Sequence, residues 1–126
     1  MITIAICDDK KAMLDYLSRE IGECFQEALV NTKISSFDSG KAFVLSHRST
    51  PFDVVFLDIV MPVKDGIAAV KEIRESDPKA VIIIVSSVGT QAQLKNAIEA
   101  GAKDFIQKPL NVEQIERVLK NYFEGR

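Results

Sequence analysis

The stretch Ala80-Val81-Ile82-Ile83-Ile84-Val85, followed by Ser86 and Ser87, is apolar throughout and then turns polar at once. Most of its residues are β-branched, and no polar residue alternates with them. A strand with this pattern is buried on both faces, as in a parallel sheet that has helices on either side. The stretch therefore predicts an interior strand of an α/β protein, with two hydroxyl groups at its carboxyl end.

Four further short runs repeat this pattern, and segments of helical periodicity separate them. The runs are Ile2–Cys7, Thr32–Phe37, Val54–Leu57 and Phe105–Gln107. Leu14, Leu17, Ile21, Cys24, Phe25 and Ala28 recur at spacings of three and four, which gives one apolar helical stripe. Five successive strand-then-helix units with right-handed crossovers predict a doubly wound α/β domain with a five-stranded parallel sheet. We expect residues 1–126 to form this single domain.

Local signals mark where several helices begin and end. Asn111 with Gln114, and Thr90 with Gln93, have the spacing of caps that satisfy unpaired amides at a helix start. Gly101 follows Ala100 at a position where a left-handed residue would end a helix. Asp65-Gly66 is expected to form a cap and turn that begin another helix.

Composition narrows the choice of partners. The chain has 126 residues, a formal net charge of −2 and two cysteines, Cys7 and Cys24, both among apolar residues. This charge gives no general attraction to nucleic acid or to an anionic membrane, so neither is expected as a partner. No apolar stretch approaches the ~20 residues that cross a bilayer, and no signal peptide is visible. We expect a cytoplasmic protein with reduced, buried thiols.

The polar residues that follow the strands carry the functional prediction. Four strands of the predicted sheet end in such residues, which are Asp8 and Asp9, Asp58, Ser86 and Ser87, and Lys108 followed by Pro109. In doubly wound sheets the site lies outside the carboxyl ends of the strands. One acid at a strand end is usually a turn residue, but four strand ends together indicate a site.

The grouping of charges suggests the chemistry. Three neighbouring carboxylates repel one another, and a hard divalent cation such as Mg²⁺ relieves that repulsion through oxygen ligands. Asp58 can then stay ionised and act as a nucleophile toward phosphorus. Mg²⁺ and Lys108 would neutralise the phosphoryl oxygens, and Ser86 would hydrogen-bond one of them. The residues thus predict phosphoryl transfer to Asp58.

The sequence resembles the response-regulator receiver domains of two-component signalling over essentially its whole length. Ser86–Pro109 is similar to chemotaxis-type receivers, whereas Ile2–Asp9 is more similar to receivers attached to transcription factors. Four stretches carry the resemblance: Ile4–Asp9; Phe56–Pro62 with Asp65-Gly66; Val85–Ser87; and Ala100–Pro109. It implies a flavodoxin-like (βα)5 fold. It also implies Asp9 and Asp58 as direct metal ligands, Asp8 acting through metal-bound water, and the backbone carbonyl of Val60 as a further ligand.

The resemblance also implies how the signal enters and leaves. A sensor histidine kinase would donate the phosphoryl group to Asp58, Lys108 would pair with that group, and Pro109 would follow through a cis peptide bond. Phe105 would turn inward when Ser86 and the loop at Ser87 move, which alters the surface that binds a downstream effector or an attached output domain. Such a domain catalyses only its own phosphorylation and dephosphorylation.

Three other functions share some of these features. A haloacid-dehalogenase-type phosphatase needs a second acid two residues after its nucleophile, where this chain has Val60. A flavin-binding electron carrier needs a phosphate loop after the first strand, where Asp8 and Asp9 would repel the phosphate. A receiver-like module that works without phosphorylation stays open, as do the kinase, the stimulus, the oligomeric state and whether the domain stands alone.

Some residues are expected to have no special role. His47, the chain's one histidine, is expected to lie on the surface near a helix end. Lys71, Glu72, Arg74 and Glu75 are expected to form a solvated helix face.

Overall fold

The computed structural model describes residues 1–59, 66–87, 91–108 and 110–122. Strands and helices alternate along this part of the chain. In chain order they are β1 (Ile2–Cys7), α1 (Lys11–Glu27), β2 (Thr32–Phe37), α2 (Gly40–Ser49), β3 (Val54–Leu57), α3 (Gly66–Ser76), β4 (Val81–Ser86), α4 (Gln91–Ala100), β5 (Asp104–Gln107) and α5 (Val112–Tyr122). All five predicted strands are present, with no boundary displaced by more than one residue, and the predicted (βα)5 fold class is confirmed.

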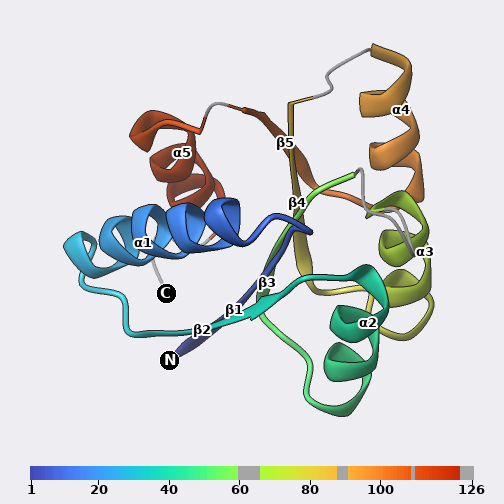
Figure 1. Ribbon diagram of the computed structural model, residues 1–126, viewed down its shortest axis with the longest axis horizontal. Helices are drawn as coiled ribbons and strands as arrows, with labels where there is room; N and C mark the ends of the chain where they lie inside the picture. Colours follow the sequence, from blue (N-terminus) through green and yellow to red (C-terminus); the bar gives the residue numbers. More distant parts are fainter. Residues whose placement is uncertain (60–65, 88–90, 109, 123–126) are drawn as a thin grey trace.

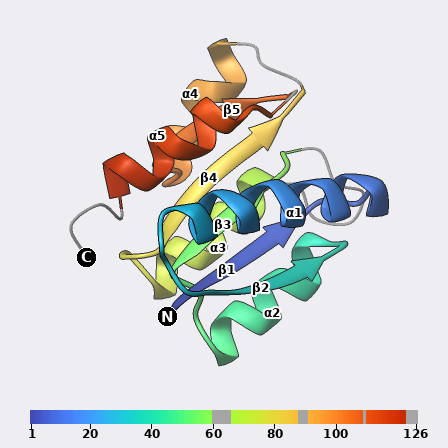
Figure 2. The ribbon, with the colours of Figure 1, turned by 90° about the vertical axis from the view of Figure 1, so that its left-hand side faces the viewer.

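The five strands form one parallel sheet in the order β2-β1-β3-β4-β5. Figure 1 shows α1 and α5 on one face of the sheet and α2, α3 and α4 on the other, and Figure 2 gives the view turned by 90°. The chain changes direction across the sheet between β1 and β3, which are neighbours. In doubly wound folds such a switch point is where sites form.

The core lies in two layers, one on each face of the sheet. One layer includes Ile4, Ile6 and Phe56 with Leu17 and Ile21 of α1 and Ile115 and Val118 of α5. The other includes Leu57, Ile82 and Ile84 with Phe43, Ile73 and Ala97 of the three opposite helices. Every residue of β4 is buried, because a central strand packs against helices on both faces. This agrees with its unbroken apolar sequence.

Several predicted helix ends are confirmed, and one unexpected end appears. The Asn111 side chain accepts from the Gln114 amide at 2.9 Å, and the Gln114 side chain accepts from the Asn111 amide at 3.1 Å. Gly101 has a φ of +124°, as expected of a residue that ends a helix. The unexpected end is at Leu29, after α1, which has a φ of +61°. Its side chain is 93% exposed. Thr90 and Asp65 lie outside the described residues.

Two expectations of surface positions were wrong. His47 is 1% exposed; its Nε2 lies 2.9 Å from an Asp77 carboxylate oxygen, and its Nδ1 accepts from the Phe52 amide. Arg74 is half-buried, and its guanidinium donates to the backbone carbonyls of Asp77, Ala80 and Gly101. Both residues join elements distant in sequence, which helical periodicity alone does not reveal.

Candidate functional site

Two buried carboxylates mark the carboxyl edge of the sheet at the switch point. Asp8 follows β1 and Asp58 follows β3, and their residues are 0% and 5% exposed. The Asp8 amide donates to the Phe37 carbonyl at 3.1 Å, and the Asp58 amide donates to the Cys7 carbonyl at 3.0 Å. These bonds continue the strand ladders by one residue, so the sheet itself fixes the backbone of both acids.

Asp9 completes a cluster of three acids. Asp8, Asp9 and Asp58 each offer one carboxylate oxygen, and these oxygens all lie within 4.8 Å of one another. Oxygens on opposite sides of an Mg²⁺ ion are ~4.2 Å apart, since each bond is ~2.1 Å long. The cluster therefore fits a small divalent cation after a movement of a fraction of an ångström. Its donors are all hard oxygens, which suits Mg²⁺.

Lys108 supplies a largely buried positive charge at the site. Its Nζ lies 2.8 Å from Asp8 Oδ2 and 3.5 Å from Asp58 Oδ2, and its side chain is 10% exposed. The Lys108 amide donates to the Ser86 carbonyl at 2.9 Å. The ammonium group thus bridges two of the three acids, and it lies at the same edge of the sheet because β4 and β5 pair there.

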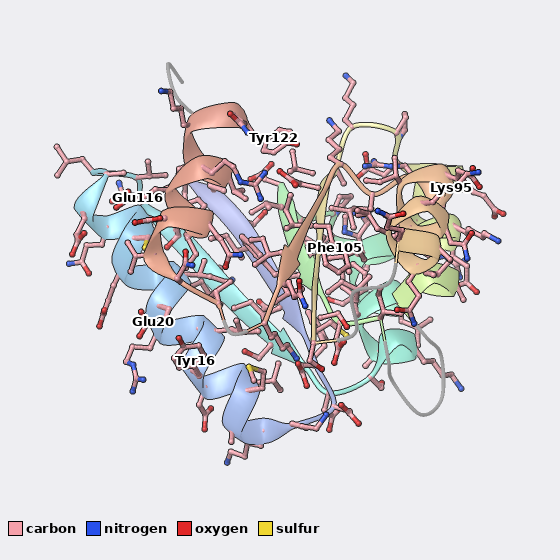
Figure 3. All side chains as sticks on the ribbon, turned by 90° about the horizontal axis from the view of Figure 1, so that it is seen from above. Tyr16, Glu20, Lys95, Phe105, Glu116 and Tyr122 are labelled. Carbon is pink, nitrogen blue, oxygen red and sulfur yellow. The ribbon has the colours of Figure 1, made fainter. Side chains whose placement is uncertain are left out.

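The predicted switch residues lie at the ends of β4 and β5. Ser86 is 1% exposed, whereas Ser87 is exposed. Phe105 is half-buried and packs against the core layer that contains Ala97 and Ala102, and Figure 3 shows it on β5. Three predicted positions, Val60, Pro109 and the loop after Ser87, lie outside the described residues.

Cys7 is the last residue of β1 and directly precedes Asp8. It is buried and forms no disulfide. Burial, and after it the negative charges of Asp8, Asp58, Asp38 and Asp9, raises the pKa of the Cys7 thiol to about 12. The thiol is therefore protonated at neutral pH. Asp38, which follows β2, was not among the predicted residues, although its place at the fifth carboxyl end of the sheet could have indicated it.

Gly66 is a second residue that sequence reasoning undervalued. A Cβ atom there would lie 2.2 Å from the Asp58 carbonyl oxygen and 2.8 Å from the Ile59 Cα. The Gly66 amide also donates to the Ile59 carbonyl at 2.7 Å. The start of α3 therefore touches the backbone of the central acid, a contact that only glycine permits without displacement. A glycine at a helix start, where a capping residue is commoner, was the available signal.

The comparison with known families rests on the whole of this arrangement. The family model of the response regulator receiver domain matches residues 4–120. This chain belongs to the response-regulator receiver family. A receiver domain is in general a signalling module that interacts with histidine kinases and downstream effectors, rather than an enzyme acting on an external substrate.

Individual relatives agree with this assignment. The chemotaxis protein CheY of Thermotoga maritima is 43% identical over 81 residues, which are 64% of this chain and 68% of that protein. The protein CcdB of Bacillus subtilis is 36% identical over 123 residues, which cover 94% of this chain and 98% of that protein. Among solved structures, the CheX–CheY–BeF3–Mg²⁺ complex of Borrelia burgdorferi has a TM-score of 0.80 and 28% identity, with 98% of this chain and 90% of that chain covered.

No helix within the described ranges is long and apolar enough to span a membrane.

Proposed function

We propose that this receiver domain accepts a phosphoryl group on Asp58 and thereby changes the surface that it offers to a partner. The observation that carries the proposal is the Lys108 ammonium between Asp8 and Asp58, at 2.8 and 3.5 Å, beside a third acid. Three acids face two lysines, the bridging Lys108 and the exposed Lys10, whose Nζ lies 3.7 Å from an Asp9 carboxylate oxygen, so the site stays net negative. A cation and a phosphoryl group together would complete that charge balance.

Asp8, Asp9 and Asp58 would hold the metal, with the backbone carbonyl of Val60 as a further ligand. Mg²⁺ would supply charge neutralisation at the phosphoryl oxygens. The solved CheX–CheY complex, whose title names BeF3 and Mg²⁺, supports this choice of metal. Asp8 is fully buried and accepts the Lys10 amide at 2.9 Å on its other oxygen, so its position is fixed before a metal arrives.

In the transfer step, an Asp58 carboxylate oxygen attacks phosphorus. The bond from phosphorus to the donor nitrogen of a phosphohistidine, or to the donor oxygen of an acyl phosphate, breaks, and the leaving group takes the electron pair. Lys108 then pairs with the phosphoryl oxygens in place of part of its contact with Asp58. No side chain needs to move a proton to start this reaction, because Asp58 acts as the carboxylate.

The signal would leave through Ser86, Ser87 and Phe105. A phosphoryl group on Asp58 offers Ser86 a hydrogen-bond acceptor, and movement of Ser86 with Ser87 makes room for the Phe105 ring. That ring packs against the layer containing Ala97 of α4. Its movement would therefore alter the surface formed by α4, β5 and α5. Pro109, through a cis bond, would set the chain direction after Lys108.

The decisive experiment treats the protein with acetyl phosphate and Mg²⁺ and measures its intact mass. We expect one added phosphoryl group on the wild type and none on Asp58→Asn. Lys108→Ala should accept phosphate more slowly and should lose the increase in partner affinity. Equal modification of wild type and Asp58→Asn would refute Asp58 as the acceptor.

The partners of this chain follow from the same proposal. We infer that a sensor histidine kinase supplies the phosphoryl group in the cytoplasm, and that an effector protein or an attached output domain reads the altered surface. Residues 1–126 would act as one domain. Transfer from a purified phosphorylated kinase, retained in wild type and lost in Asp58→Asn, is the corresponding measurement.

A further inference from the structure

A tyrosine hydroxyl fixes the chain close to the site lysine. Tyr16 lies on α1, and its hydroxyl donates to the Leu110 carbonyl at 3.1 Å across 94 positions of sequence. The Tyr16 ring is half-buried against the core layer that contains Leu110, which is itself 5% exposed. The bond thus joins α1, which begins beside the acids, to the segment that follows β5.

This bond lies two residues beyond Lys108. Consecutive Cα atoms are at most ~3.8 Å apart, so a fixed Leu110 confines the Lys108 Cα to within ~7.6 Å of it. Only Pro109 intervenes, and a proline ring restricts backbone rotation. On its other side, Lys108 is held by the hydrogen bond that its backbone amide donates to the Ser86 carbonyl. The Lys108 backbone is therefore fixed by β4 before the lysine and by α1 after it.

A long lysine side chain has several rotamers, and ordering it costs up to ~2 kcal/mol. The Lys108 ammonium nevertheless has to lie between Asp8 and Asp58. A backbone held on both sides of Lys108 restricts where its Cα can lie, so fewer backbone positions have to be combined with the side-chain rotamers. Asp8 lies in the turn between β1 and α1, and Tyr16 lies in α1, so the segment that follows the acids carries the anchor of the lysine.

The chain contains a natural comparison for this bond. Its other tyrosine, Tyr122 of α5, donates its hydroxyl to the Lys103 carbonyl at 3.0 Å. Lys103 precedes β5, whereas Leu110 follows it, so the two hydroxyls hold opposite ends of the same strand. Figure 3 labels both side chains, Tyr16 on α1 and Tyr122 on α5. Only the Tyr16 bond lies on the side of Lys108.

We propose that Tyr16 is a positioning residue for phosphoryl recognition, acting through the Leu110 carbonyl to hold Lys108 between Asp8 and Asp58. The inference rests on the proposed function of Asp58 and Lys108. It adds α1 to the elements that determine how well the lysine meets a phosphoryl group.

The experiment compares Tyr16→Phe with Tyr122→Phe, because each removes one hydroxyl and its bond to a carbonyl. Tyr122→Phe also removes a contact with the Asp104 side chain. Beryllofluoride with Mg²⁺ serves as the phosphoryl probe, and ¹⁹F NMR measures its affinity and the shifts of the bound fluorines. We expect Tyr16→Phe to weaken binding about two- to ten-fold, the effect of one lost hydrogen bond, and to shift a bound fluorine signal. Tyr122→Phe should bind as the wild type does.

Two controls separate positioning from general destabilisation. In a Lys108→Ala background, the effect of Tyr16→Phe on affinity should vanish, because the group that Tyr16 positions is absent. In the metal-free protein, the Lys108 ε-methylene NMR signal should move in Tyr16→Phe and stay in place in Tyr122→Phe.

Equal losses of affinity in the two tyrosine variants, or an undiminished Tyr16→Phe effect without Lys108, would overturn the inference and leave Asp58 as acceptor intact. Failure of the wild type to bind beryllofluoride would instead count against the proposed function. The metal-free NMR comparison would still decide whether Tyr16 positions Lys108.

Discussion

The two edges of the sheet hold their buried charges in opposite ways. At the carboxyl edge, three carboxylate oxygens from Asp8, Asp9 and Asp58 lie within 4.8 Å, and Lys108 bridges only two of these acids. At the amino edge, His47 meets Asp77, and the Arg74 guanidinium meets three backbone carbonyls. The third acid, Asp9, has only the exposed Lys10 at 3.7 Å. The amino edge therefore pairs its charged groups within the protein, whereas the carboxyl edge keeps a net negative charge.

The contrast shows how buried polar groups can be interpreted. A charged group whose hydrogen bonds are satisfied locally stabilises one arrangement of the chain. Like charges held together by the backbone destabilise the protein until a ligand arrives, and such sites are where function is expected. Substitutions at the carboxyl edge should therefore impair phosphoryl uptake first, and those at the amino edge should reduce stability first.

Apart from the acids and Lys108 themselves, the largest effect on function is expected at Gly66. In Gly66→Ala, the new methyl group would collide with the Asp58 carbonyl at 2.2 Å, so the central acid or α3 must shift. We expect phosphorylation by acetyl phosphate to slow by at least about ten-fold, since small displacements at a reacting centre are costly. Gly22→Ala is the matched control, because its methyl group would meet only the tip of Ile34 at 3.3 Å. Similar rates for both variants would show that the contact at Asp58 is unimportant.

At the amino edge, Arg74→Met should reduce stability with little change in phosphorylation rate. The change removes a charged donor from the carbonyls of Asp77, Ala80 and Gly101. Because Arg74 is only half-buried, water replaces part of the loss, and we expect about 1–3 kcal/mol from urea unfolding. Lys71→Met, on the exposed side of the same helix, should cost less than about 0.5 kcal/mol. If Arg74→Met slowed phosphorylation as much as Gly66→Ala does, the proposed difference between the two edges would be contradicted.

The His47–Asp77 pair predicts a pH dependence that belongs to the amino edge. Burial raises the pKa of Asp77, but hydrogen bonds from His47 and from the Lys79 and Ala80 amides outweigh it and lower the pKa below 3.8. A lowered folded-state pKa adds stability that is present above about pH 4 and is lost as the pH falls through the folded-state value. We expect the free energy of unfolding of wild type to exceed that of Asp77→Asn by about 1 kcal/mol at pH 7. This difference should shrink below pH 4. A constant difference down to pH 2.5 would contradict this origin.

A small stabilising effect is expected at Leu29, where the amino edge carries backbone strain. Leu29 has a φ of +61°, and its amide bonds to Gln26 while the Val30 amide bonds to Phe25, the pattern of a helix end that favours glycine. Leu29→Gly should raise stability by about 1 kcal/mol, because the side chain is exposed and packs on little. Thermal unfolding measures this, with Leu45→Gly, in the middle of α2, as a destabilising control. A lower melting temperature for Leu29→Gly would show that the side chain contributes contacts in spite of its exposure.

The sequence predicted the elements and the carboxyl edge better than the amino edge, for a physical reason. Strands such as Val54–Leu57 follow from local composition, and Asp8, Asp58 and Lys108 meet because all parallel strands end at one edge. His47 and Arg74 find their partners through the packing of helices onto loops, at separations such as 30 positions for His47 and Asp77. Gly66 likewise matters through a contact between helix and strand. No periodicity in the sequence records these contacts.

The reactivity of Cys7 can be used to measure how often the carboxyl edge of the sheet opens. Its thiol is 1% exposed, and burial with the surrounding acids holds its pKa at about 12, so a folded molecule presents almost no thiolate to an alkylating reagent. Alkylation of Cys7 then requires the strand end to open, and its rate follows how often that opening occurs. Each additional charged group that binds both Asp8 and Asp58 should slow the alkylation of Cys7. The rate of Cys7 alkylation thus measures how often the carboxyl edge opens around the three acids, without any probe being attached to it.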